Sequence, residues 1–137
     1  MTDIDSNKII QHMYEHDSYS QWLGIKVLEI RPGFSRLSML VRDDMCNGFG
    51  IAHGGISFSF ADTALAFASN AHGIQAFSIE TSIQHYSAIK VGDELEAITT
   101  ERFLSEKSAV YEIKVMRAAE TVAKFDGTVF RAKAWEL

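Results

Sequence analysis

The sequence predicts an α+β protein in which a curved antiparallel sheet wraps around one long central helix. Residues 54–70 form an apolar run in which Asp62 is the only charged side chain, and Gly73 supplies a helix stop. A helix that is apolar on nearly every face has to be covered on nearly every face. After Gly73, apolar and polar residues alternate over successive segments, as they do in antiparallel strands. A sheet curved around the helix satisfies both patterns.

The first part of the chain carries signals for a short helix and a hairpin. Apolar residues recur at helical spacing over residues 6–16, where Ser6 is a suitable N-terminal cap. Residues 22–23 then lead into two strands, at 24–30 and 34–41. A Pro-Gly turn separates these strands, because proline and glycine suit a turn and interrupt a ladder.

The second part of the chain is expected to supply the rest of the sheet. A polar loop at residues 43–50 precedes the central helix. Gly127 interrupts the alternation of the last strand and predicts a β-bulge there. No repeat or linker divides the chain, so we expect residues 1–137 to form a single domain. The strands after the helix are expected at residues 75–87, 94–103, 108–116 and 121–135.

Composition and charge argue against several classes of function. The net charge is −5 and the basic residues are scattered, which speaks against nucleic acid as a partner. Cys46 is the only cysteine, so no intrachain disulfide can form. Residues 1–10 lack the segments of a secretory signal, and residues 49–79 are too polar to span a membrane. We therefore expect a cytoplasmic protein without a membrane partner.

Asp62 is the residue that most suggests chemistry, because a carboxylate on an apolar helix must face a pocket or a partner. A structural tie between helix and sheet is the alternative interpretation. Upstream, residues 47–55 contain four glycines, which let a ligand approach backbone N–H groups at the start of the helix. Because such a site favours developing negative charge, this segment is a candidate oxyanion hole.

The spacing of these residues resembles the signature of the PaaI-type thioesterases of the hotdog superfamily. Asn47 is followed by His53-Gly54-Gly55, and Asp62 lies nine residues after the histidine. The resemblance implies the hotdog fold and hydrolysis of an acyl-CoA thioester to the free acid and CoA, with no cofactor and no metal. The likeness continues through residues 78–83 and 91–93.

The resemblance also implies a role for each residue of the signature. Asp62 would act as general base toward water or as nucleophile, and Asn47 would position the water or the acyl group. His53 and the Gly54 backbone N–H would polarise the carbonyl. Ser78 would orient the water, and the alternative for Ser78 is a strand serine bonded only to backbone.

Substrate contacts are expected from residues near the site and at strand ends. His85 and Tyr86 are candidates to face the acyl group, although such a strand end is also typical of surface. Basic side chains at strand ends are candidates to bind the CoA phosphates, with solvated surface charge as the alternative. The substrate-binding candidates are Gly55, Thr63, His85, Tyr86, Lys90 and Lys107, with Arg102 as a further basic side chain.

The acyl group is the least determined part of the prediction. The resemblance suggests a phenylacetyl or hydroxyphenylacetyl thioester, with medium-chain acyl-CoA next. The chain departs from the family near residues 87–88, where relatives commonly carry a proline. This departure leaves the acyl specificity open.

Helix geometry favours a site shared between two subunits. His53 and Asp62 lie nine residues apart, which is about 13 Å along a regular helix and about half a turn around it. They cannot meet at one carbonyl, whereas a two-fold dimer brings Asp62 of one copy to Gly54 of the other. The resemblance implies the same dimer with paired sheets, and it further implies a tetramer.

Three other groups of residues suggest different chemistry. Residues 12–16 match an H-x-x-E-H zinc pattern, but a short terminal helix offers neither a further ligand nor an enclosed pocket. Cys46 has no neighbouring base that would activate it as a nucleophile. His72 suits a helix end, where a cation offsets the helix dipole.

Two alternative functions stay open at this point. Hotdog hydratases share the frame and the acyl-thioester substrates, but they show a proline-containing Asp/His or His/Glu signature that this sequence lacks. A non-catalytic acyl-CoA-binding module is the alternative from outside the enzymes.

Overall fold

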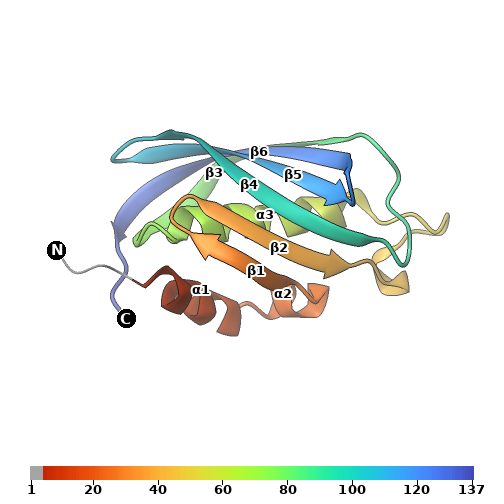
Figure 1. Ribbon diagram of the computed structural model, residues 1–137, viewed down its shortest axis with the longest axis horizontal. Helices are drawn as coiled ribbons and strands as arrows, with labels where there is room; N and C mark the ends of the chain where they lie inside the picture. Colours follow the sequence, from red (N-terminus) through yellow and green to blue (C-terminus); the bar gives the residue numbers. More distant parts are fainter. Residues whose placement is uncertain (1–4) are drawn as a thin grey trace.

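A six-stranded antiparallel sheet curves around one long helix (Figure 1). The computed structural model describes residues 5–137, so the first four residues of the N-terminal stretch analysed for a secretory signal lie outside it. The helices are α1 (Ser6–Glu15), α2 (Ser18–Leu23) and α3 (Gly54–Asn70), and a 3-10 turn spans Asp43–Met45. The strands are β1 (Lys26–Arg31), β2 (Phe34–Leu40), β3 (Ile74–His85), β4 (Glu94–Leu104), β5 (Ser108–Arg117) and β6 (Glu120–Ala134). Their order in the sheet is β1-β2-β4-β5-β6-β3.

Helix α3 spans the residues that its apolar pattern predicted, Gly54–Asn70. Its large apolar side chains include Phe60, Leu65 and Phe67, each at most 1% exposed. Burial of a side chain of this size contributes roughly 1.5–3 kcal/mol to stability. One stripe of α3 is less covered than the rest, and we call it the open stripe. Its residues are Gly55, Ser59, Asp62 and Ala66.

Two short helices, rather than one, precede the sheet. The cap of α1 is Asp5 and not the predicted Ser6, whose hydroxyl donates to a backbone carbonyl instead. Residues 22–23 lead into the strands as predicted, but they do so as the end of α2, a helix that the sequence analysis did not predict. Asp17 caps α2 at its start, and Gly24 ends it with a left-handed φ of 73°.

Strand β3 forms one edge of the sheet. The sequence predicted successive strands after α3, but β3 pairs with β6 and not with the next strand along the chain. Phe77 and Ile79 of β3 are 56% and 66% exposed. A long edge strand with exposed apolar side chains is a surface on which a further strand can pair.

Gly127 keeps the regular register of β6, so the prediction of a bulge at this glycine is wrong. It pairs with Thr81 on β3 and with Tyr111 on β5. The register shifts elsewhere, at residues 78–80 of β3 and at residues 115–116 of β5. The broken alternation of the last strand therefore has its origin outside Gly127.

We expect Gly127→Val to destabilise the protein, because a Cβ on Gly127 would lie 2.7 Å from Cδ2 of Leu65 on α3. Overfilling a packed core costs about 1–3 kcal/mol, so the free energy of unfolding in urea should fall by that amount. Thr128→Val, on the outer face of the same strand, is the matched control and should change stability by about 0.5 kcal/mol or less. A Gly127→Val protein as stable as the wild type would contradict the close packing of β6 on α3.

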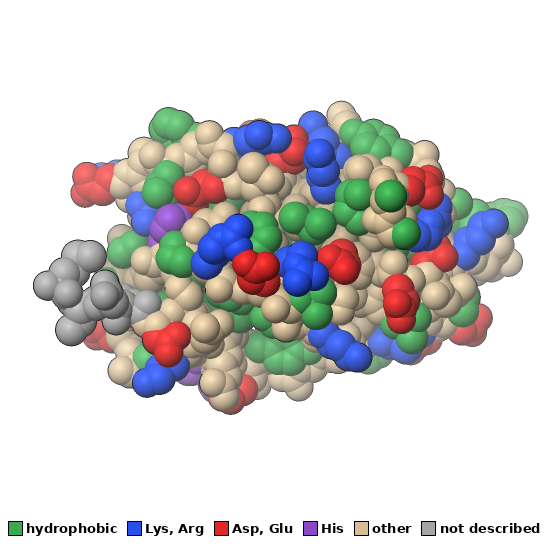
Figure 2. All heavy atoms as spheres, in the orientation of Figure 1, with side chains coloured by type: hydrophobic (Ala, Val, Ile, Leu, Met, Phe, Trp, Pro, Cys, Tyr) green, Lys and Arg blue, Asp and Glu red, His purple; other side chains and the backbone are tan. Residues whose placement is uncertain are grey.

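The face formed by β1, β2 and β4 carries charges of both signs. Figure 2 shows acidic and basic side chains interspersed over this face. Because the charges are mixed, this face has no extended region of electrostatic potential of a single sign. In the described part of the chain, no helix is both long and apolar enough to cross a bilayer.

Candidate active site

The N-terminus of α3 presents backbone N–H groups to solvent. His53 is the N-cap residue, and its carbonyl accepts the Ile56 N–H at 2.9 Å. His53, Gly54 and Gly55 are all exposed. The first N–H groups of a helix have no acceptor within the helix, and the helix dipole strengthens them as donors to a negative oxygen. This end of α3 can therefore stabilise an oxyanion.

The side chain of Asn47 stabilises the loop that leads into α3 through hydrogen bonds to its backbone. Its Oδ1 accepts the backbone N–H groups of Phe49 at 2.9 Å and of Ile51 at 3.2 Å. Because both hydrogen bonds use the oxygen, the Nδ2 amide hydrogens are the part of Asn47 that can meet a substrate. Toward a ligand, Asn47 is thus a donor.

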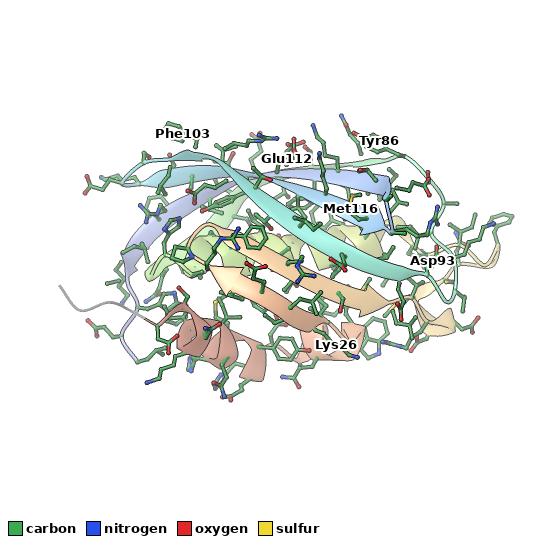
Figure 3. All side chains as sticks on the ribbon, viewed as in Figure 1. Lys26, Tyr86, Asp93, Phe103, Glu112 and Met116 are labelled. Carbon is green, nitrogen blue, oxygen red and sulfur yellow. The ribbon has the colours of Figure 1, made fainter. Side chains whose placement is uncertain are left out.

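The connection between β3 and β4 holds this loop from the other side. The Ala52 N–H donates to the Ile89 carbonyl at 2.7 Å, and Lys90 forms a β-bridge to the same loop. Asp93, labelled in Figure 3, closes the connection by accepting the Lys90 N–H at 2.9 Å and Arg117 Nη1 at 2.7 Å. Burial opposes ionisation of Asp93, but these donors together lower its pKa below the usual value. Lys90, a predicted CoA contact, therefore lies beside the N-terminus of α3.

Asp62 lies partly buried on the open stripe of α3. It lines a cavity of about 490 Å³ together with Ser78 of β3. Burial raises the pKa of Asp62, and the negative charge of Asp17 raises it further. A carboxylate with a raised pKa binds a proton more readily, which suits a general base. The structure thus brings two predicted catalytic residues, Asp62 and Ser78, to one cavity.

His85 faces the N-terminus of α3, whereas Tyr86 does not. Nε2 of His85 lies 3.2 Å from the position of a Cβ on Gly54, and its Nδ1 lies 3.4 Å from Oγ of Ser57. Ser57 is 2% exposed, and no sequence pattern had singled it out. Tyr86 is 54% exposed at the outer side of the sheet, and its hydroxyl donates to Gln84 (Figure 3). Tyr86 follows the end of β3, so of this pair only His85 approaches Gly54.

Thr63 is buried against α2. Its hydroxyl lies 2.9 Å from Oγ of Ser20, which donates to Oδ2 of Asp17 at 2.6 Å. The predicted substrate contact at Thr63 therefore joins two helices in this structure. Sequence reasoning missed Asp17 and Ser20, although aspartate is a preferred N-cap residue.

The predicted basic residues are spread over the molecule. Arg102 forms an ion pair with Glu112 at 2.8 Å. Lys107 lies in the turn between β4 and β5, and its carbonyl accepts the N–H of Arg131, which pairs with the start of β3. Lys90 follows the end of β3. Lys90 and Lys107 therefore lie at opposite ends of this strand within one subunit.

The other groups that the sequence suggested lie apart from the cavity. The rings of His12 and His16 are tilted by 42° with centroids 4.5 Å apart, and residues 5–137 contain no cluster of three or more metal-ligating side chains. Cys46 Sγ donates to a backbone carbonyl at 3.5 Å. His72 follows the end of α3 as predicted, and its Nε2 lies 2.5 Å from Oε2 of Glu101.

The candidate site residues thus form two groups within one subunit. One group, at the N-terminus of α3, contains Asn47, His53, Gly54, Gly55 and His85. The other group, in the cavity along the helix, contains Asp62 and Ser78. About 13 Å of helix separates His53 from Asp62, so one subunit does not place both at the same carbonyl.

Known proteins of one family are similar to this chain in both sequence and structure. Residues 49–124 match the profile of the thioesterase superfamily. The acyl-coenzyme A thioesterase PaaI of Escherichia coli is 36% identical over 87% of this chain and 86% of its own. The structure of the E. coli PaaI protein from the phenylacetic acid degradation operon has a TM-score of 0.91 and 33% identity, over 95% of both chains. A mutant of the phenylacetic acid degradation protein PaaI from Thermus thermophilus has a TM-score of 0.82 and 36% identity, over 85% of this chain and 100% of its own.

These similarities agree with the sequence signature and with the architecture. The structural relatives confirm the α+β hotdog fold, a curved antiparallel sheet around a central helix. The matched segment covers more than half of the chain and includes both His53 and Asp62. The chain therefore belongs to the thioesterase superfamily.

Proposed function

We propose that this protein hydrolyses acyl-CoA thioesters to the free acid and CoA. The observation that carries the proposal is the carboxylate of Asp62, which has a raised pKa and lines a cavity with the hydroxyl-bearing Ser78. Membership of the thioesterase superfamily supports the reaction type, and the E. coli relative named an acyl-coenzyme A thioesterase supports CoA as the thiol. A cytoplasmic location stays a prediction of the sequence.

In the proposed mechanism Asp62 is the general base, and a nucleophilic Asp62 is the alternative. Asp62 removes a proton from water while the water oxygen bonds to the thioester carbon and the carbonyl electrons move to oxygen. The Gly54 N–H and Asn47 Nδ2 donate to that oxyanion, and His53 adds to its polarisation. Ser78 orients the water. When the intermediate collapses, the C–S bond breaks, and the departing CoA thiolate receives the proton that Asp62 holds.

A two-fold dimer would complete this site. The edge strand β3 can pair with β3 of a second copy, which joins the two sheets. The small residues of the open stripe would then let the two α3 helices approach each other in antiparallel orientation. With the two-fold axis near Phe58, midway between Gly54 and Asp62, each Asp62 lies opposite the Gly54 of the other subunit.

The same dimer would bring together the basic residues proposed to bind CoA. Because paired β3 strands run antiparallel, the start of one strand lies beside the end of the other. Lys107, near the start of β3, would thereby approach Lys90 of the second subunit, which follows the end of that strand. Two lysines gathered in this way suit the phosphates of CoA.

A tetramer would require a further contact between dimers. Phe77 of β3 and Phe130 of β6 are paired neighbours, 56% and 45% exposed. Phe103, labelled in Figure 3, is 53% exposed on β4. These aromatic side chains offer apolar surface for that contact.

A panel of acyl-CoA substrates tests the proposed function. We expect release of the CoA thiol, followed with a thiol reagent, to be fastest for phenylacetyl-CoA or hydroxyphenylacetyl-CoA, with medium-chain acyl-CoA next. The reason is the likeness to the E. coli and T. thermophilus proteins that carry phenylacetate names. Bovine serum albumin at equal concentration gives the background rate.

Two outcomes of the panel would overturn the proposal. Tight binding of acyl-CoA with no thiol release above background would make the protein a binding module. Addition of water to an enoyl-CoA without thiol release would make it a hydratase. Either result leaves the fold assignment intact.

A further inference from the structure

A hydrogen-bonded relay links the N-terminal helices to the turn of α3 that carries Asp62. Oδ1 of Asp17 accepts the Ser20 N–H at 3.0 Å, and its Oδ2 accepts the Ser20 hydroxyl at 2.6 Å. The oxygens of Ser20 and Thr63 lie 2.9 Å apart. Ser20 and Thr63 are 1% and 8% exposed, so this relay is shielded from competing water. Thr63 follows Asp62 directly in α3.

The charge of Asp17 also acts on the cavity. After burial, Asp17 is the cause that raises the pKa of Asp62. The groups that line the cavity come from α1, α3, β3, β6 and the C-terminal segment, and Asp62 is the only titratable group among the described lining residues. From α2 and its cap the titratable groups are Asp17 and Tyr19, whose hydroxyl donates to Ser59 of the open stripe at 2.9 Å. In the proposed dimer His53 of the second subunit would face Asp62 as well. Asp17 is thus the charged neighbour of Asp62 within its own subunit.

We propose that Asp17 is a positioning residue for thioester hydrolysis. Through Ser20 and Thr63 it fixes the helical turn that carries Asp62, and it places a negative charge two hydrogen bonds away from Thr63, the residue next to Asp62. The inference rests on the proposed function of Asp62. It assigns to the N-terminal helices a part in the reaction that no residue of the sequence signature supplies.

Asp17→Asn tests the charge while it keeps the helix cap. Asparagine caps helices as well as aspartate does, and its amide can donate to the Ser20 hydroxyl, which then donates to Thr63. We expect the melting temperature to stay unchanged and the acidic limb of the kcat/KM profile to move to lower pH, because a repelling charge is lost. The plateau of kcat/KM should fall by less than about tenfold, since the base is weaker but still in place. Carboxyl NMR of Asp62 measures the same change without turnover.

Asp5→Asn is the matched control for this substitution. Asp5 caps α1 as Asp17 caps α2, and its side chain accepts the Asn7 N–H at 3.0 Å. The pH profile of Asp5→Asn should coincide with that of the wild type. Coinciding profiles of Asp17→Asn and wild type, or an equal displacement in Asp5→Asn, would overturn the proposal.

Ser20→Ala tests the relay while it keeps the charge. Loss of the link to Thr63 should lower kcat by about tenfold with little change in KM, because small displacements of a reacting group are costly. The acidic limb should stay in place. Ser18→Ala, an exposed position of the same helix, is the control and should behave as wild type. A normal kcat for Ser20→Ala would show that the relay does not position Asp62. Full activity of Asp62→Asn would instead exclude Asp62 as the reactive group, and absence of thiol release from every acyl-CoA of the panel would overturn the proposed function.

Discussion

Replacing Asp62 with asparagine is expected to lower kcat by about 10²- to 10⁴-fold, the contribution typical of a general base. The substitution keeps the shape of the side chain and removes the oxygen that accepts the proton. A nucleophilic Asp62 predicts a comparable loss, because a neutral amide does not attack a thioester carbon. The measurement is thiol release from the best acyl-CoA of the panel, with kcat and KM determined separately.

Asp126→Asn is the matched control for this loss. Asp126 lies on β6, and its carboxylate is 3.7 Å from Nζ of Lys124 at the surface. Its kcat should equal that of the wild type. An unchanged KM in Asp62→Asn would show that the substrate site survives the substitution. Near-normal turnover in Asp62→Asn would exclude Asp62 as the reactive group and leave it as a structural tie.

Asp62→Asn should also raise the stability of the protein near neutral pH. The pKa of Asp62 in the folded protein lies above its ordinary value of 3.8, so the folded protein holds this proton more tightly than the unfolded chain. As the pH rises from about 3.8 through the raised pKa, Asp62 ionises first in the unfolded chain. This earlier ionisation favours the unfolded chain, so the stability of the folded protein falls. Asparagine does not ionise, so Asp62→Asn should melt higher at neutral pH, and the difference should vanish in acid. A lower melting temperature at neutral pH would mean that the carboxylate stabilises the fold.

The central helix could be predicted from the sequence because its signals are local. Its apolar run and the glycines at its two ends place it at Gly54–Asn70, where it lies in the structure. The edge position of β3 could not be predicted, since alternation identifies a strand but not its partner. Helix α2 could not be predicted from the sequence because its six residues are too few to display a helical period.

Gly127 illustrates the same limit at a single residue. The sequence indicates that a glycine interrupts an alternating strand, and a bulge is one physical reason for such a glycine. The structure supplies the other reason, which is the close approach of Leu65. Leu65 lies far from Gly127 in the chain, so no local pattern distinguishes the two.

The candidate site, too, could be predicted from the sequence only in part. The spacing of Asn47, His53 and Asp62 in one segment was enough to predict the family, which the comparisons confirm. Tertiary packing decides that His85 rather than Tyr86 approaches the helix, and it links Asp17 through Ser20 to Thr63, the residue next to Asp62. The roles of these residues in catalysis stay predictions until the variants are measured.

Mixing two inactive variants, Asp62→Ala and His53→Ala, is expected to restore about a quarter of wild-type activity under subunit exchange. A mixed dimer has one site built from the intact His53 of one chain and the intact Asp62 of the other. Its second site lacks both residues. Random exchange at equal concentrations makes about half of the dimers mixed, and each mixed dimer has one of its two sites intact.

The restored activity separates a shared site from a site within one chain. If each site used His53 and Asp62 of the same chain, every chain in the mixture would lack one of them, and the mixture would stay inactive. Mixed dimers purified through two different affinity tags should reach about half of wild-type activity, and doubly tagged dimers of Asp62→Ala alone should show none. An inactive mixed dimer with both chains present would reject the two-fold site, because the helix separation would then have to be bridged within one subunit.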